Sequence, residues 1–292
     1  MVIFYENTIT PNIVKLFIRC FVRLCLKKNT VFINKFIIFT VKIFCFASVY
    51  RFCSANTRYL LIIKKNKMET INWCGYEWRK QERWGNVYPT NLRGWMDPSC
   101  VNIDDRGYLH LLTKRNPKYF ERTKFTHLFG VGLVSCTHRF GYGYFEIEAK
   151  LPEGKNLWPA FWMWSYDSWP PEIDIFEGYS NDRGDYRDIK FPRFWELFKV
   201  ETNFHIKEDG GIGAERFFMG NNPSRNFNKY ACLWEPNKIE IFFNGSTVRV
   251  LRNEKAFNDT TMNVIINNMV RRNRNDFSES DFVVKYFRYE KR

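Results

Sequence analysis

Three carboxylates within six residues are the part of this sequence best suited to chemistry. Glu172-Ile-Asp-Ile-Phe-Glu177 alternates acidic and apolar residues, a pattern typical of a strand with one polar and one buried face. In a regular strand Glu172 and Asp174 point to one face, and Glu177 points to the other. A β-bulge of one extra residue restores the parity and brings all three carboxylates to the same face.

The bulge also predicts the distance between the two glutamates. Ile173 and one of Ile175 or Phe176 then face the core, and Glu172 and Glu177 lie effectively four strand positions apart, roughly 13 Å. Side chains that lean inward reduce this separation to about 5 Å, which fits the nucleophile and general acid of a retaining double displacement at a sugar. A solvated acidic edge strand or a calcium-binding strand is the structural alternative.

Tryptophans near the acidic run favour a cleft floor over a solvated edge. Trp158, Trp162 and Trp164 share parity along the predicted strand at 159–166, and core packing between two sheets is the alternative role for such side chains. We therefore do not expect all three to line a cleft. Trp158 and Trp169 are the candidates for stacking on a sugar, and Trp169 stands in a Ser-Trp-Pro-Pro loop that leads into the acidic run.

Short strands supply the frame for these residues. From residue 100 onward, alternating runs are separated by turn residues such as Asn244-Gly245, without helical periodicity between them. This pattern predicts an all-β protein, an antiparallel sandwich. The predicted strands cover 100–103, 108–112, 142–151, 159–166, 172–178, 230–235, 238–243, 247–251 and 281–289.

Charge is distributed unevenly along the 292 residues. Residues 1–67 carry twelve basic residues and one acid, Glu6, so that +11 of the formal net charge of +14 lies there and +3 remains for residues 68–292. The apolar content of 45% excludes a disordered chain. Nucleic-acid binding would need a basic stripe in the body, so we do not expect a nucleic-acid partner.

Residues 1–67 contain no Gly and no Trp, and we expect them to lie outside a domain formed by residues 68–292. One interpretation is translation upstream of a true start at Met68. Another is a secretory signal, which would place the protein outside the cell or in the cell envelope. The third is a signal anchor or a basic segment at a membrane surface. The apolar stretch at 36–49 is too short for a stable membrane span.

The four cysteines of the body are scattered and form no C-x-x-C pair, so the sequence leaves disulfides and buried thiols open and indicates no zinc site.

Seven segments, in this order, resemble glycoside hydrolase family 16, the endo-β-glycanases that include laminarinases, lichenases, agarases and carrageenases. The resemblance covers nearly all of residues 72–290. Its most specific part is the Glu-x-Asp-x-x-Glu run with the upstream Trp-Pro-Ala-Phe-Trp. The matching segments are Gly75-Tyr-Glu-Trp, Asp105-Arg-Gly107-Tyr-Leu-His-Leu, Gly141-Tyr-Gly-Tyr-Phe-Glu-Ile-Glu-Ala-Lys-Leu-Pro152, Leu157-Trp-Pro-Ala-Phe-Trp162, Glu172-Ile-Asp-Ile-Phe-Glu177, Leu233-Trp-Glu-Pro236 and Lys285-Tyr-Phe-Arg-Tyr289.

The resemblance implies a jelly-roll sandwich with a substrate cleft on its concave sheet. It also implies a role for each carboxylate: Glu172 as nucleophile, Glu177 as general acid and base, and Asp174 as the assisting carboxylate. The implied reaction is retaining, endo-acting hydrolysis of a β-linked polysaccharide, with β-1,3 or β-1,3/1,4-glucan ahead of a galactan such as agarose. A transglycosylase of the same fold and a non-catalytic carbohydrate-binding sandwich are the alternatives.

The resemblance extends to residues beyond the acidic run. Glu146 matches a strand glutamate that reaches the cleft, and His205 matches a position near the assisting aspartate, although a lone His is more often a structural core or rim residue. Lys285 stands where many members carry an aspartate that ligates calcium, and an ammonium group cannot ligate a cation, so we expect neither a metal nor another cofactor. We expect a monomer, and a loop over the cleft at 182–201.

Overall fold

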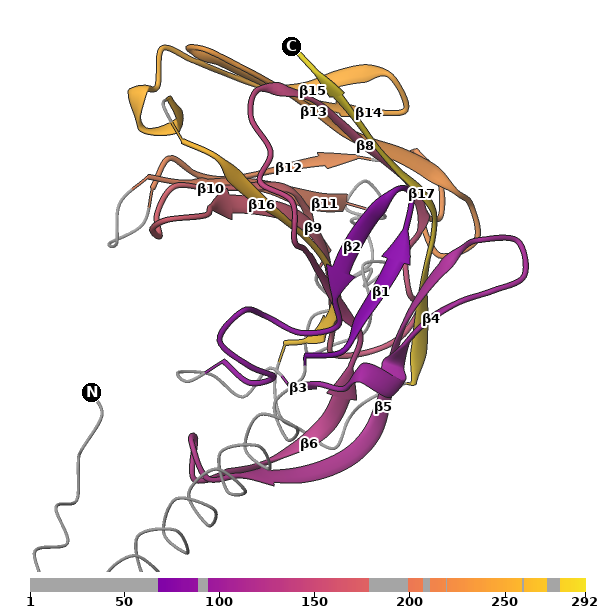
Figure 1. Ribbon diagram of the computed structural model, residues 1–292. Coiled ribbons are helices and arrows are strands. Elements are labelled where there is room, and N and C mark those ends of the chain that lie inside the picture. Colours follow the sequence, from indigo (N-terminus) through magenta and orange to yellow (C-terminus); the bar gives the residue numbers. More distant parts are fainter. Residues whose placement is uncertain are drawn as a thin grey trace, which may run out of the picture. The chain divides into compact units, whose positions relative to one another are not determined.

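Two β-sheets pack face to face in the computed structural model (Figure 1), which describes residues 68–88, 94–178, 199–206, 211–218, 220–258, 260–271 and 279–292. This arrangement confirms the predicted all-β sandwich. Apart from the parallel pair β3 and β6, the paired strands are antiparallel.

The sheet that carries the acidic run has eight strands and is called the site sheet below. In spatial order it contains β1 (Thr70–Trp73), β2 (Tyr76–Arg79), β7 (Leu133–Cys136), β16 (Met262–Val270), β9 (Leu157–Ser165), β10 (Glu172–Glu177), β11 (Lys199–His205) and β12 (Gly213–Phe218).

The second sheet has nine strands. Its spatial order is β15 (Ser246–Arg252), β14 (Lys238–Phe243), β13 (Asn228–Glu235), β8 (Gly143–Lys150), β17 (Ser280–Lys291), β5 (Leu109–Phe120), β6 (Phe125–Val131) and β3 (Trp95–Met96), with β4 (Val101–Ile103) paired to β5. Among the described residues, two short 3₁₀ helices, η1 (Pro98–Cys100) and η3 (Lys255–Phe257), lie in the connections.

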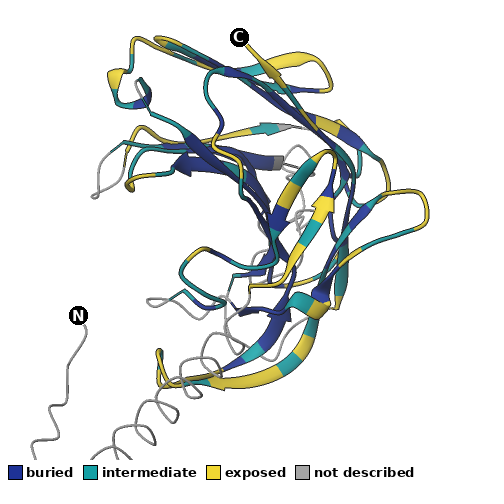
Figure 2. Cartoon of the chain, viewed as in Figure 1, coloured by how far each residue is buried: buried dark blue, intermediate teal, exposed yellow. Residues whose placement is uncertain are grey.

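Alternation along the strands separates the core from the cleft. On β9, Phe161 and Met163 are fully buried and pack in the core between the sheets, whereas the tryptophans of opposite parity point to the other side of the site sheet. The central strands of both sheets are mostly buried (Figure 2). On β9, side chains of one parity therefore pack in the core and stabilise the fold, and side chains of the other parity are available for a site.

The predicted bulge is present in β10. The register with β9 shifts between Asp174 and Phe176, and the register with β11 shifts between Asp174 and Glu177. Both Ile175 and Phe176 pack in the core, whereas the sequence predicted that one of the two would do so.

Cys74, Cys100, Cys136 and Cys232 are free thiols in the structure, which answers the question left open by their spacing. The predictions for residues 1–67 lie outside the described residues, and so does most of the predicted loop, at 182–198. The last three residues of that loop, 199–201, belong to β11. Within the described ranges, no helix has the length and apolar character needed to cross a membrane.

Candidate active site

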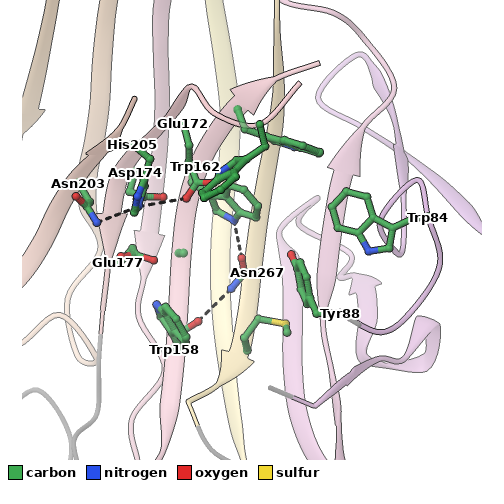
Figure 3. Close-up of a pocket in the computed structure, with 14 residues that line it drawn as sticks. Trp84, Tyr88, Trp158, Trp162, Glu172, Asp174, Glu177, Asn203, His205 and Asn267 are labelled. Atoms are coloured by element: carbon green, nitrogen blue, oxygen red, sulfur yellow. Dashed lines mark hydrogen bonds and ion pairs between the residues drawn. The ribbon is translucent and has the colours of Figure 1, made fainter. Parts of the chain in front are cut away.

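The three carboxylates of β10 line one cavity of about 570 Å³ on the site sheet (Figure 3). Asp174 is only 1% exposed, whereas Glu172 and Glu177 are half-buried. The bulge allows this arrangement because it turns Glu177 to the face already occupied by Glu172 and Asp174. The sequence-predicted catalytic residues are therefore brought together.

Glu172 and Asp174 share an imidazole neighbour from the next strand. His205 on β11 places its Nε2 atom 3.6 Å from Glu172 Oε1 and 3.3 Å from Asp174 Oδ2. The side-chain amide nitrogen of Asn203 lies 3.0 Å from the same Nε2 atom. His205 thus lies against the acidic group as expected, and Asn203 was not predicted although it shares the parity of His205.

The loop before β10 supplies a direct hydrogen bond to the first glutamate. The indole N–H of Trp169 donates to Glu172 Oε2 over 2.7 Å, and the ring of Trp169 lies 6.1 Å from that of His205. Trp169 is 44% exposed and lines the cavity. It therefore combines a hydrogen bond to a carboxylate with an aromatic surface that faces solvent.

All three tryptophans of β9 line the cavity, so the expectation that they would not do so together is wrong. Trp158, Trp162 and Trp164 have the same parity, and the core face of this strand is filled by other residues. Asn267 from β16 joins two of them: its Oδ1 accepts from the indole N–H of Trp162 at 2.7 Å, and its Nδ2 donates to the backbone oxygen of Trp158 at 3.0 Å. This bridge is visible in Figure 3.

The segment after β2 adds two cavity residues that the sequence did not reveal, Trp84 and Tyr88. Behind them lies Glu82, whose side chain is fully buried. Burial raises the pKa of Glu82 to about 7; a hydrogen bond from Tyr88 and the charges of Arg83 and Arg79 act in the opposite direction, and the charge of Glu172 adds to the increase.

Glu146 does not reach the cavity, and its assignment to substrate binding is wrong. It lies on β8 in the second sheet, between the core residues Phe145 and Ile147, so its side chain points to the outer face of that sheet. There the hydroxyl groups of Tyr144 and Tyr286 each donate to its carboxylate at 2.7 Å. The expected place of Glu146 in the cleft came from the family resemblance, whereas its strand belongs to the second sheet.

Two groups of residues are relevant to metal binding. Glu172, Asp174 and His205 offer ligand atoms that all lie within 4.8 Å of one another, so this group has the donor set for a cation. Lys285, at the position where the family resemblance would place a calcium ligand, forms an ion pair with Glu148. The ammonium group thus meets a carboxylate in the second sheet, away from the cavity.

Comparison with known families agrees with this geometry. Residues 101–288, more than half of the chain, match the family model for glycosyl hydrolases family 16. The chain belongs to this family. Its acidic run and its tryptophan strand fall within the matched residues, and the match ends inside the last strand, β17.

Individual proteins and solved structures are similar to this chain over different lengths. Endo-1,3-1,4-beta-glycanase EglC of Rhizobium meliloti is 29% identical over 108 residues, which are 37% of this chain and 20% of EglC. The laminarinase catalytic domain from Thermotoga maritima superposes with a TM-score of 0.57 at 22% identity, covering 72% of this chain and 85% of that domain. A non-specific endo-beta-1,3(4)-glucanase from family GH16 gives 0.59 at 21% identity, covering 78% and 88%.

The match to EglC thus spans only about a fifth of the length of that relative. The two solved structures establish likeness of fold.

Proposed function

We propose that residues 68–292 form the catalytic domain of a retaining, endo-acting glycoside hydrolase that cleaves β-linked polysaccharide. The observation that carries the proposal is the bulge in β10, which places three carboxylates on one face at the floor of an aromatic-lined cavity. A structural role alone would not favour three clustered carboxylates, because like charges at short range repel each other.

Glu172 is assigned the role of nucleophile. Its carboxylate attacks the anomeric carbon and forms a covalent glycosyl ester, while Glu177 gives its proton to the glycosidic oxygen as the bond to the leaving chain breaks. Glu177 then takes a proton from water, and the resulting hydroxide displaces Glu172 from the anomeric carbon. Two inversions give net retention.

Asp174 is assigned to assist the nucleophile. It is almost fully buried beside Glu172, and His205 lies within 3.6 Å of one oxygen of each. A buried carboxylate and an imidazole on one side of Glu172, with the Trp169 N–H on another, hold the nucleophile in place. Orientation of this kind lowers the barrier because the reacting atoms need less reorganisation.

The favoured substrate is β-1,3 or mixed β-1,3/1,4-glucan. The names of the similar proteins support glucan, and the cavity offers tryptophan faces of the kind that pack against sugar rings. A galactan such as agarose is the alternative substrate, and transfer of the glycosyl group to an acceptor sugar in place of water is the alternative reaction. We propose that the domain acts as a monomer.

The test is a panel of β-glucans, xyloglucan, agars and carrageenans assayed for new reducing ends. Hydrolysis raises the number of reducing ends, whereas transglycosylation redistributes chain lengths without raising it. Glu172→Ala should abolish hydrolysis, and added azide should restore turnover with an α-linked azide product, because a small anion fills the space of the lost nucleophile. Release of no reducing ends and no redistribution on any of these polymers would reject the proposal.

A further inference from the structure

Glu82 is a buried carboxyl group that the proposed reaction does not use. Its side chain has no exposed surface, and one oxygen, Oε1, accepts a hydrogen bond from the Tyr88 hydroxyl at 3.1 Å. The other oxygen, Oε2, has no hydrogen-bond partner among the described residues. Burial of a carboxyl group with incomplete hydrogen bonding is unfavourable for stability, which points to a role outside the packing of the core.

Tyr88, the partner of Glu82, belongs to the wall of the cavity. Tyr88 and Trp84 both line it, with their ring centroids 5.7 Å apart. The Trp84 ring in turn meets Trp164 of β9 edge-on, at 5.4 Å and an interplanar angle of 77°. Figure 3 shows Trp84 and Tyr88 on the side of the cavity opposite the three carboxylates, with Trp162 between the two groups.

The hydrogen bond fixes which way the Tyr88 hydroxyl can interact. A phenol has one proton, and above about pH 7, where Glu82 is ionised, the carboxylate only accepts hydrogen bonds. Tyr88 gives its proton to Glu82, so toward a ligand its oxygen acts as an acceptor. Sugar hydroxyl groups are donors of the matching kind, and the adjacent Trp84 ring offers an apolar face for the C–H side of a pyranose.

We propose that Trp84 and Tyr88 form a separate sugar-binding subsite, remote from the bond that is cleaved, and that Glu82 is the positioning residue that anchors the Tyr88 hydroxyl. This inference rests on the proposed function, because it requires a polysaccharide in the cavity. The subsite would bind a neutral pyranose with a free hydroxyl group, one that only a sufficiently long chain places there.

Paired substitutions separate anchoring from charge. Glu82→Gln and Glu82→Met both remove the carboxylate charge that acts on Glu172, but only Gln retains an oxygen that can accept from Tyr88. Tyr88→Phe removes the hydroxyl itself. Tyr119→Phe is the matched control, because Tyr119 is 56% exposed near the end of β5 and does not line the cavity.

The measurement is kcat and KM at pH 8 for β-gluco-oligosaccharides of increasing length, on the full chain. For each variant, kcat/KM on long substrates is divided by kcat/KM on short substrates. In Tyr88→Phe and Glu82→Met this ratio should fall by roughly tenfold, which corresponds to the loss of one hydrogen bond in a binding site. The fall should come from a higher KM for long substrates rather than from a lower kcat. Glu82→Gln should lose markedly less than Glu82→Met, and Tyr119→Phe should leave the ratio unchanged. Thermal unfolding of each variant identifies any loss caused by misfolding.

Two results would overturn the subsite while the proposed function stands: a length ratio that is unchanged in Tyr88→Phe, or equal losses in Glu82→Gln and Glu82→Met. Absence of cleavage by the unsubstituted chain, on every glycan of the polysaccharide panel, would instead reject the proposed function and the subsite with it.

Discussion

Replacement of Glu82 by glutamine should change how the stability of the protein depends on pH. Burial raises the pKa of Glu82 from its usual value of 4.5 to about 7 in the folded protein. Between these two pH values the folded state holds a proton that the unfolded state has released. The free energy of unfolding of the unsubstituted protein therefore falls as pH rises through this window, and the contribution of Glu82 is constant above about pH 7.

The size of this effect follows from the two pKa values. One pKa unit corresponds to about 1.4 kcal/mol, so the difference between 4.5 and about 7 corresponds to roughly 3 kcal/mol. Glu82→Gln has no group to ionise at this position. Its free energy of unfolding, relative to that of the unsubstituted protein, should increase by roughly 3 kcal/mol between pH 4.5 and pH 8.

Urea unfolding, followed by tryptophan fluorescence at several pH values, measures this difference. Titrating groups that do not interact with Glu82 contribute equally to both proteins, so the subtraction isolates Glu82 together with its electrostatic coupling to Glu172, Arg83 and Arg79. A difference between the two proteins that stays constant from pH 4.5 to pH 8 would refute the reasoning, because Glu82 would then ionise alike in the folded and unfolded states.

Three further predictions concern the boundary, the metal and the assisting carboxylate. A chain that begins at Met68 should fold and retain full activity; insolubility of that chain beside a soluble full-length chain would show that residues 1–67 are structural. A chelator should leave the melting temperature unchanged, because Lys285 pairs with Glu148 at the position where a calcium ligand would be needed. A fall in melting temperature of several degrees that added calcium reverses would contradict this prediction. Asp174→Asn should lower kcat less than Glu172→Ala or Glu177→Ala, the latter by roughly 10²–10⁴-fold on polysaccharide; equal losses in all three would argue against an assisting role.

Local pattern predicted much of the fold. The strand at 238–243 was predicted with the bounds observed for β14, and the predicted strand at 230–235 falls within β13. The bulge in β10 was also predictable, because three carboxylates at this spacing share a face only if one extra residue is inserted. Information of this kind lies within a few consecutive residues.

What the sequence did not predict depends on contacts between distant segments. Glu146 was misplaced because its assignment rested on the family resemblance alone, and its strand, β8, lies in the second sheet. Trp84 and Asn267 enter the cavity from segments about 90 residues away from β10 on either side, so no local pattern marks them. Whether all three tryptophans of β9 face the cavity likewise depends on which side chains fill the core between the two sheets. The sequence of β9 alone does not determine this.

The configuration of the first product tests the central claim most directly. Glu172 and Glu177 are assigned to a double displacement, which predicts that a β-linked substrate first yields a β-configured hemiacetal. Proton NMR of the anomeric signals in the first minutes of hydrolysis, before mutarotation equilibrates the anomers, distinguishes the outcomes. An initial β signal is the predicted result. An initial α signal would show a single displacement by water and would contradict the assignment of Glu172 as nucleophile.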